Sequence, residues 1–248
     1  MIVTPIKTHK ITSEDKDILK ILDKYINSLE DKSVVAVTSK IIAISEGRII
    51  KIGSISKDEL VMKEADLYLP RHMSKYDFMI SIKNGIFTAS GGIDESNGDG
   101  YYVMWPKNPQ APANKIREHL AKKFNIKNIG VIITDSKTTP LRWGVTGVAI
   151  AHSGFEALNS YIGKPDIFGR IMKAEKLNVT DTLAGTAVGV MGEGNEQIPL
   201  AVIEDVSFVK FQPRNPTEEE LKDLKIDIED DLYAPLITSV PWKKGEKS

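Results

Sequence analysis

The stretch Gly130-Val131-Ile132-Ile133-Thr134-Asp135-Ser136 predicts the centre of the fold. Its apolar run of strand-favouring residues is typical of a short strand that is buried on both faces. The run ends in an aspartate that is followed by a hydroxyl side chain. In open sheets covered by helices, ligand sites gather at the carboxyl ends of the strands. The stretch therefore predicts a buried strand with a candidate site at Asp135.

The segments around this strand alternate between strands and helices. Residues 112–124 carry apolar side chains at helical spacing, and residues 145–151 are typical of another buried strand. Asn84-Gly85 predicts a hairpin with a type I′ turn. Further strands are expected at residues 2–7, 34–38, 48–52, 78–83, 86–89, 101–105, 199–203 and 206–211. Further helices are expected after a Ser13 cap, around 41–45, and at 57–65, 179–191 and 218–224, the last one capped by Thr217.

Length and composition limit the class of protein. A chain of 248 residues fits one large unit or two small ones. The weakest seam lies near residues 106–112, and residues 212–248 are expected to form a C-terminal helix and a solvated tail. The net charge of −1 argues against a nucleic-acid partner. The absence of cysteine excludes disulfides, cysteine-ligated zinc, iron–sulfur clusters and a thiol nucleophile.

No targeting or membrane signal is visible in the sequence. Residues 1–10 lack the apolar core and cleavage site of a signal peptide. The charge-free run at residues 143–155 is too short and too rich in small polar residues to cross about 30 Å of hydrocarbon. We therefore expect a cytoplasmic protein without a membrane partner.

The common catalytic motifs are absent from the sequence. It contains no phosphate-binding P-loop, no glycine-rich dinucleotide fingerprint and no nucleophile elbow. The four histidines at positions 9, 72, 119 and 152 lack paired ligand spacing, which makes histidine-based zinc chemistry a poor hypothesis. His152 is the most plausible of them for a chemical role, although a hydrogen-bonded core histidine is the favoured interpretation.

Three acidic residues stand next to glycines or at a strand end. Asp94 follows Gly91-Gly92, Asp135 follows the buried strand, and Glu193 lies between Gly192 and Gly194. Carboxylate and hydroxyl oxygens are the ligands that Mg²⁺ and Mn²⁺ prefer. The alternative is that each residue merely caps a helix or a turn. Composition and spacing leave both interpretations open.

The order of these motifs resembles the coenzyme F-420:L-glutamate ligases, a family of γ-glutamyl ligases. The resemblance rests on Gly-Ile-Asp-Glu-Ser-Asn at 92–97, Ile-Ile-Thr-Asp at 132–135 and Met-Gly-Glu-Gly at 191–194. Ser45-Glu46-Gly47-Arg48, Arg142-Trp143-Gly144 and the block at 166–170 are similar to further family stretches. The similarity covers roughly residues 34–203.

The resemblance implies a fold, a reaction and an assembly. The fold is α+β, with two lobes, mixed sheets and an intertwined homodimer. The reaction uses GTP (with ATP not excluded) and Mg²⁺ or Mn²⁺ to join the amine of L-glutamate to a carboxylate of a deazaflavin acceptor. Activation of that carboxylate is most simply an acyl phosphate. The apolar cluster Tyr101, Tyr102, Met104 and Trp105 is either core or dimer interface.

The resemblance also assigns site residues. It places metal ligands at Asp94, Asp135, Ser136 and Glu193. It places nucleotide contacts at Ser39, Lys40, Asn97, Met191, Gly192, Glu193, Gly194, Asn195, Gln197 and Ile198. Arg142 and Arg170 are the candidate catalytic arginines, because a guanidinium binds carboxylates and phosphates in a bidentate manner; a surface ion pair is the alternative for each.

Some positions depart from the family pattern. Ile44 stands where the family has a lysine, Thr138-Thr139 replace a Gly-Arg pair, and Glu204-Asp205 replace an Arg-Gly pair. These changes leave open the guanine preference and the acceptor. A folate-type γ-glutamyl ligase and a non-catalytic nucleotide- or metal-binding protein on the same scaffold are therefore the alternatives.

Overall fold

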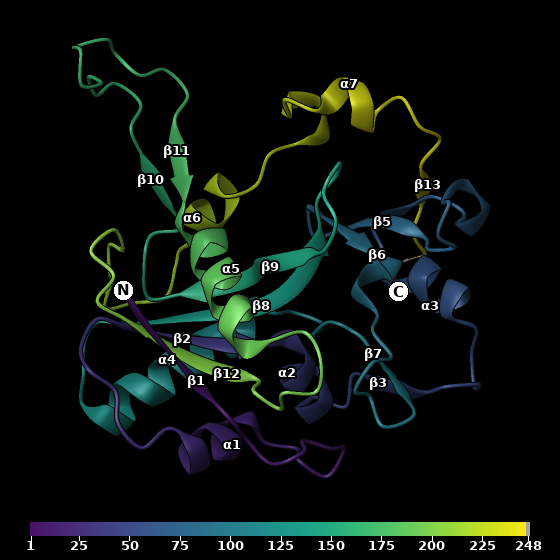
Figure 1. Cartoon of the computed structure of the whole chain (residues 1–248), viewed down its shortest axis with the longest axis horizontal. Helices are drawn as coiled ribbons and strands as arrows, with labels where there is room; N and C mark the ends of the chain where they lie inside the picture. Colours follow the sequence, from purple (N-terminus) through teal and green to yellow (C-terminus); the bar gives the residue numbers. More distant parts are fainter. Residues whose placement is uncertain (247–248) are drawn as a thin grey trace.

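A five-stranded mixed sheet forms the centre of the molecule in the computed structural model, which describes residues 1–246. Its strands are, in spatial order, β1 (Ile2–Ile6), β12 (Leu200–Glu204), β2 (Ser33–Thr38), β8 (Ile129–Thr138) and β9 (Val145–Ser153) (Figure 1). β2 and β8 run parallel, and the other neighbours are antiparallel. The buried strand predicted around residues 130–134 is therefore confirmed.

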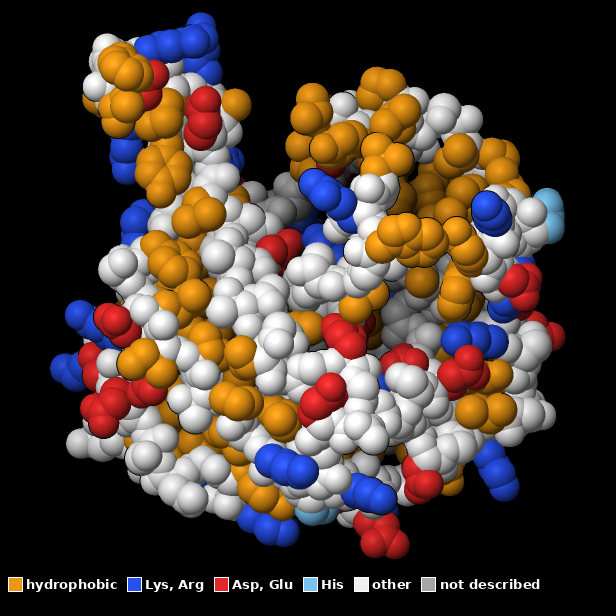
Figure 2. Space-filling model, viewed as in Figure 1, with side chains coloured by type: hydrophobic (Ala, Val, Ile, Leu, Met, Phe, Trp, Pro, Cys, Tyr) orange, Lys and Arg blue, Asp and Glu red, His pale blue; other side chains and the backbone are white. Residues whose placement is uncertain are grey.

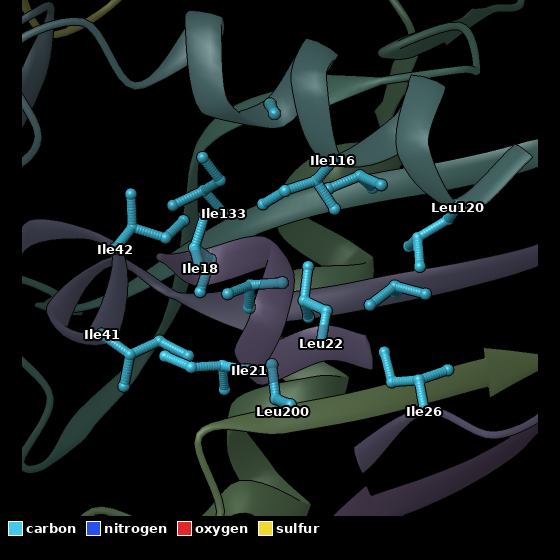
Figure 3. Close-up of a cluster of buried hydrophobic side chains, with 14 of the residues drawn as sticks. Ile18, Ile21, Leu22, Ile26, Ile41, Ile42, Ile116, Leu120, Ile133 and Leu200 are labelled. Atoms are coloured by element: carbon cyan, nitrogen blue, oxygen red, sulfur yellow. The ribbon is translucent and has the colours of Figure 1, made fainter. Parts of the chain in front are cut away.

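Helices bury both faces of this sheet. On one face α1 (Ile18–Tyr25), α2 (Ser39–Ser45) and α4 (Gln110–Phe124) pack their apolar side chains onto Val35 and Val37 (Figure 3). On the other face α5 (Val179–Met191) packs onto Val34 and Ala36. Because side chains alternate between the faces of a strand, the unbroken apolar run of β2 supplies both cores at once.

A second group of elements carries a smaller core. The four-stranded sheet has the order β13 (Lys243–Lys244), β4 (Leu67–Tyr68), β5 (Ile80–Lys83) and β6 (Ile86–Ala89). α3 (Lys57–Glu64) and the pair β3 (Ile49–Lys51) and β7 (Tyr101–Val103) pack beside it. Asn84 and Gly85 have φ values of 53° and 78°, which confirms the type I′ turn.

An arm projects from the main body. It consists of the strands β10 (Leu158–Ser160) and β11 (Lys176–Asn178) and the loop between them (Figure 1). Figure 2 shows that hydrophobic and basic side chains gather along it. Five large hydrophobic side chains of the loop are exposed, namely Tyr161, Ile162, Ile167, Phe168 and Ile171. Whether the arm takes part in the expected homodimer stays a prediction.

The C-terminal segment returns to the second group of elements. It contains α6 (Glu218–Asp223) and α7 (Ala234–Ile237), and it ends in β13, which pairs with β4 (Figure 1). The Trp242 ring also lies edge-on to Phe87. The helix expected in residues 212–248 is present as α6, and none of the residues 212–246 is fully buried. Three short 3₁₀ helices complete the described elements, at Arg71–Met73, Ser90–Gly92 and Ile228–Asp230.

Most predicted elements are confirmed, and three predictions are wrong. Ser13 does not cap the first helix, because α1 begins at Ile18 and the Asp17 side chain accepts the backbone N–H of Leu19. Residues 206–211 form no strand beyond a single bridge between Phe155 and Phe211. The strand that carries Asp135 does not end there but continues to Thr138.

The architecture is mixed α+β, as expected. The seam near residues 106–112 and the division into lobes stay predictions. Within residues 1–246, every helix is too short or too polar to cross a bilayer.

Candidate functional site

The candidate site lies where the two parallel strands separate. The pairing of β2 with β8 ends at Thr38 and Thr134. Beyond this point Lys40 enters α2, while Asp135 and Ser136 continue on β8. A register shift between Ile133 and Thr134 precedes Asp135, and such bulges redirect the side chains that follow them. The carboxyl ends of the parallel pair therefore bring Lys40 and Asp135 to the same edge.

Asp94 comes to this edge from the second group of elements. Its backbone forms two hydrogen bonds with Val103, of 3.0 and 2.7 Å. The Lys40 ammonium lies 2.6 Å from Asp94 Oδ2 and 2.7 Å from the Ser96 carbonyl oxygen. The Ser96 hydroxyl and backbone N–H also donate to the Asp94 carboxylate, at 2.7 and 2.8 Å. Lys40 thus fixes the loop of Asp94 to the end of the parallel strands.

The third acidic motif is attached to the first two by hydrogen bonds. Gly192 ends α5 with a φ of 82°, and the chain then turns toward the site. Ser136 Oγ donates to Glu193 Oε1 at 2.6 Å. Asn97 Nδ2 donates to the Gly194 carbonyl oxygen at 2.9 Å. The structure therefore connects all three acidic motifs, although 99 residues separate Asp94 from Glu193 in the sequence.

The two aspartates have opposite electrostatic surroundings. Burial acts to raise the pKa of Asp94, but the Lys40 ammonium and the hydrogen bonds from Ser96 outweigh it, so the pKa is lowered. For Asp135 burial dominates and raises the pKa to about 6, with the negative charge of Asp94 adding to the effect. Hydrogen bonds from Trp105 and from the Ser136 backbone oppose this rise. The pair therefore holds negative charge that a cation would stabilise.

The donor atoms of this edge suit a hard divalent cation. Lys40 already holds a positive charge among a carboxylate, a carbonyl and a hydroxyl oxygen, which are the oxygen types that bind Mg²⁺. Residues 1–246 contain no cluster of three or more acidic, histidine or cysteine side chains arranged as a complete metal cage. Since Mg²⁺ commonly takes one or two carboxylates together with waters and other oxygen ligands, Asp94 and Asp135 fit a divalent cation.

The other residues expected to contact nucleotide lie around the same edge or support it. Ser39 is buried at the start of α2, and Met191 is buried at the end of α5. The Gln197 side chain donates to the carbonyl oxygen of Thr8, and Ile198 packs against the core under α5. Asn195 is exposed in the loop after α5. These contacts tie the loop at residues 192–198 to the sheet.

The two candidate catalytic arginines stand apart from the carboxylates. Arg142 is exposed at the tip of the β8–β9 hairpin, and Arg170 is exposed in the loop of the projecting arm. Within residues 1–246, no hydrogen bond or ion pair joins either guanidinium to another group of the chain. Their proposed contact with phosphate or carboxylate stays a prediction.

Sequence reasoning missed a group of residues behind Asp135. Trp105 donates its indole N–H to Asp135 Oδ2, and its ring lies under the Lys83 ammonium. Glu64 pairs with both Lys83 and Arg48, at 2.7 and 2.6 Å. The sequence pattern indicates only core or interface for Trp105. Trp105 is only 2% exposed. Because a buried indole N–H needs a hydrogen-bond acceptor, a tryptophan in an apolar cluster indicates a polar partner nearby.

Comparison with known proteins agrees with the resemblance seen in the motifs. The profile of the family described as F420-0:Gamma-glutamyl ligase matches residues 5–205. The chain is 34% identical over 221 residues to the coenzyme F420:L-glutamate ligase of Methanocaldococcus jannaschii, which covers 84% of this chain and 85% of the relative. It is 32% identical over 213 residues to the enzyme of that name from Methanococcus maripaludis, covering 78% of this chain and 83% of the relative. The matched region contains all three acidic motifs, and the chain belongs to the F420-0:gamma-glutamyl ligase family.

Proposed function

We propose that this chain is a coenzyme F420:L-glutamate ligase that uses a nucleoside triphosphate and a divalent cation. In addition to family membership, one structural observation supports the proposal. Hydrogen bonds from Lys40, Asn97 and Ser136 gather the acidic motifs at the carboxyl edge of the parallel strands. This is the place where open sheets with covering helices bind ligands.

In this proposal each side chain of the edge has a distinct role. Asp94 and Asp135 supply anionic oxygens for Mg²⁺ or Mn²⁺, with the Ser136 hydroxyl and Glu193 beside them. A bound divalent cation neutralises the charge that develops on the phosphates during transfer. Lys40, which contacts Asp94 in the structure, would be available to a phosphate oxygen if a cation took its place at this carboxylate. The loop at residues 192–198, held by Asn97, closes over the nucleotide.

The proposed reaction proceeds in two steps. A carboxylate oxygen of the acceptor attacks the γ-phosphorus of GTP, so that GDP leaves and an acyl phosphate forms. The amine of L-glutamate then attacks the acyl carbon, losing a proton, and inorganic phosphate leaves as the amide forms. Arg142 and Arg170 are proposed to bind the carboxylate or phosphate groups of these reactants, because a guanidinium provides paired N–H donors.

The test combines product analysis with binding measurements. The purified protein is incubated with L-glutamate, GTP or ATP, Mg²⁺ or Mn²⁺, and either an F420-type acceptor or folate, and the products are identified by mass spectrometry. The proposal expects one amide-linked glutamate added to the F420-type acceptor, together with release of phosphate. If only folate is glutamylated, the acceptor is folate and not an F420-type molecule. Tight binding of nucleotide and Mn²⁺ without any product would instead support a non-catalytic binding protein.

A further inference from the structure

Trp105 connects the two aspartates of the candidate site. Its indole N–H donates to Asp135 Oδ2. The loop of Asp94 meets the same ring, because a Cβ added to Gly92 would lie 2.6 Å from Trp105 Nε1. Gly92, with a φ of 69°, therefore permits a close approach that a larger residue would block. The two contacts place Trp105 between the strand of Asp135 and the turn that precedes Asp94.

A partly buried charged cluster holds Trp105 in this position. Arg48 Nε donates to the Trp105 carbonyl oxygen at 3.1 Å, which fixes the backbone. Lys83 Nζ lies 5.5 Å from the centre of the indole ring, within the range of a cation–π interaction. Glu64 accepts hydrogen bonds from Arg48 Nη2 and Lys83 Nζ, at 2.6 and 2.7 Å. The ring is thus restrained through its backbone and through its face.

The charges of this cluster are complementary to Asp135. Arg48 and Lys83 carry two positive charges and Glu64 one negative charge, which leaves one positive charge in excess. Lys83 is only 5% exposed, so water screens this charge weakly. The carboxylate of Asp135 attracts the Lys83 ammonium electrostatically. The cluster therefore places an attractive positive charge beside Asp135, behind the ring of Trp105.

We propose that Trp105 is a positioning residue, which fixes the orientation of the Asp135 carboxylate for a divalent cation. Arg48, Glu64 and Lys83 act in turn on Trp105. A carboxylate offers about four acceptor positions, so the indole N–H and the Ser136 backbone leave oxygen lone pairs free for a cation. Partners that orient metal ligands in this way typically change metal affinity by about 10- to 100-fold when they are removed. This inference rests on the proposed function of the site.

The first test needs neither cation nor substrate. The chain has three tryptophans, so a ¹H–¹⁵N spectrum shows three indole N–H signals, and Trp105→Phe identifies the one of interest. We expect this signal to lie downfield and to exchange slowly with solvent, whereas that of Trp143, which is 90% exposed, exchanges fast. Asp135→Asn should move the Trp105 signal upfield, because the acceptor loses its charge. A Trp105 signal that is unaffected by this substitution overturns the inference.

The second test measures Mn²⁺ binding by calorimetry in the full-length protein. Trp105→Phe keeps an aromatic ring but removes the N–H, and we expect Mn²⁺ to bind about 10- to 100-fold more weakly. Trp242→Phe is the matched control, since it also removes an indole hydrogen bond, to the Ile237 carbonyl oxygen 2.7 Å away, and should leave Mn²⁺ affinity unchanged. Lys83→Met should weaken binding less than Trp105→Phe does.

The outcomes separate this inference from the proposed function. If Trp105→Phe binds Mn²⁺ as the wild type does while Asp135→Asn does not, the site is real and Trp105 does not position it. If the wild type binds no Mn²⁺ with or without nucleotide, the proposed metal-dependent function fails, and with it the role of Trp105 toward a cation. The indole spectrum still reports on the contact with Asp135 in that case, and it also shows whether the variants are folded.

Discussion

The ammonium of Lys40 and the carboxylate of Asp94 form a 2.6 Å ion pair between the end of the parallel strands and a loop 54 residues away. The side chain of Asp94 is 49% exposed and that of Lys40 23%, so solvent reaches this pair. Ion pairs that solvent reaches contribute little to folding. Under the proposed function, the pair instead holds a positive charge beside the Asp94 carboxylate that a divalent cation would replace.

Lys40→Met tests this exchange. Without the ammonium, the Asp94 oxygens are free, so we expect Mn²⁺ alone to bind several-fold more tightly than it does to the wild type. Loss of a charge-assisted contact with phosphate should weaken nucleotide binding by roughly tenfold or more. Calorimetric titrations with Mn²⁺ and with GTP measure the two effects separately.

The matched control for Lys40 is Lys57→Met. Lys57 pairs with Glu95 at 3.4 Å, next to Asp94 in the sequence. This variant removes an ion pair from the same loop without touching Asp94, and both affinities should stay near those of the wild type. If Lys40→Met lowers only the melting temperature and changes neither affinity, Lys40 is a structural residue.

Asn97→Asp tests the connection between the loops of Asp94 and Glu193. Asn97 has a φ of 52°, a conformation that aspartate also tolerates. The change replaces an N–H donor with an anionic oxygen facing the Gly194 carbonyl, so the contact becomes repulsive. We expect faster amide hydrogen exchange at residues 192–198 and a loss of roughly 3- to 10-fold in nucleotide affinity.

Asn125→Asp serves as the comparison for Asn97. Asn125 is an exposed asparagine at the end of α4 with a φ of 53°, so this variant adds the same charge at a matching backbone conformation, where none of the described residues makes a hydrogen bond to the side chain. Exchange and affinity should change much less. Equal effects from both variants would show that added charge, and not the lost contact with Gly194, is responsible.

Much of the fold is encoded in local patterns that a single sequence shows. The run at residues 34–38 is apolar on both alternating faces, and the structure buries both. Thr217 and Glu220 form the capping box that starts α6, as the predicted Thr217 cap implies. The strand predicted at residues 206–211 is absent because Val206 and Val209 are buried against α5 without pairing to a strand. Hydrophobicity predicts burial there, but not the hydrogen bonds of a sheet.

The site was only partly predictable for a similar reason. Glycine-flanked carboxylates and family motifs indicated Asp94, Asp135 and Glu193. The partners of these residues depend on contacts between distant segments, such as Trp105 with Asp135 and Lys40 with Asp94. Gly92 shows the difference clearly. In the structure the Trp105 ring lies against this residue, a contact that the sequence pattern does not identify.

His152 predicts a pH dependence of stability. It is 1% exposed, and burial lowers its pKa from 6.5 to about 4, an effect that the nearby Glu220 carboxylate opposes. The unfolded chain therefore binds a proton between these pH values while the folded protein does not. Stability is fully present above pH 6.5 and should fall by about 3 kcal/mol as the pH drops to 4.

His152→Leu isolates this contribution. Urea unfolding of both proteins between pH 7 and 4 gives their difference in unfolding free energy, in which other titrating groups such as Asp135 cancel. The difference should change in favour of the variant as the pH falls, because leucine takes up no proton. A constant difference across this range would mean that the folded protein accommodates the imidazolium.

Asp135→Asn tests the assignment of the cation site most directly. Asparagine keeps the size of the side chain and still offers Trp105 an oxygen acceptor, but it removes the negative charge. We expect Mn²⁺ affinity and turnover to fall by orders of magnitude. In chelator the melting temperature should be equal or higher, because the buried charge beside Asp94 no longer opposes folding. Calorimetry with Mn²⁺ and thermal unfolding in chelator measure the two effects.

A purely structural role for Asp135 gives the opposite pattern, and Asp181 provides the reference for it. Asp181 accepts a hydrogen bond from the Ala149 N–H at 3.0 Å and lies 3.4 Å from the Lys137 ammonium, so it supports β8 and β9 without joining the three acidic motifs. Asp181→Asn should lower the melting temperature in chelator and leave Mn²⁺ affinity unchanged. If Asp135→Asn behaves like Asp181→Asn, losing stability while keeping affinity and turnover, Asp135 is a structural residue and the cation must be held elsewhere. If the two variants change the melting temperature in opposite directions, and only Asp135→Asn loses Mn²⁺ affinity, the charge of Asp135 serves to bind the cation.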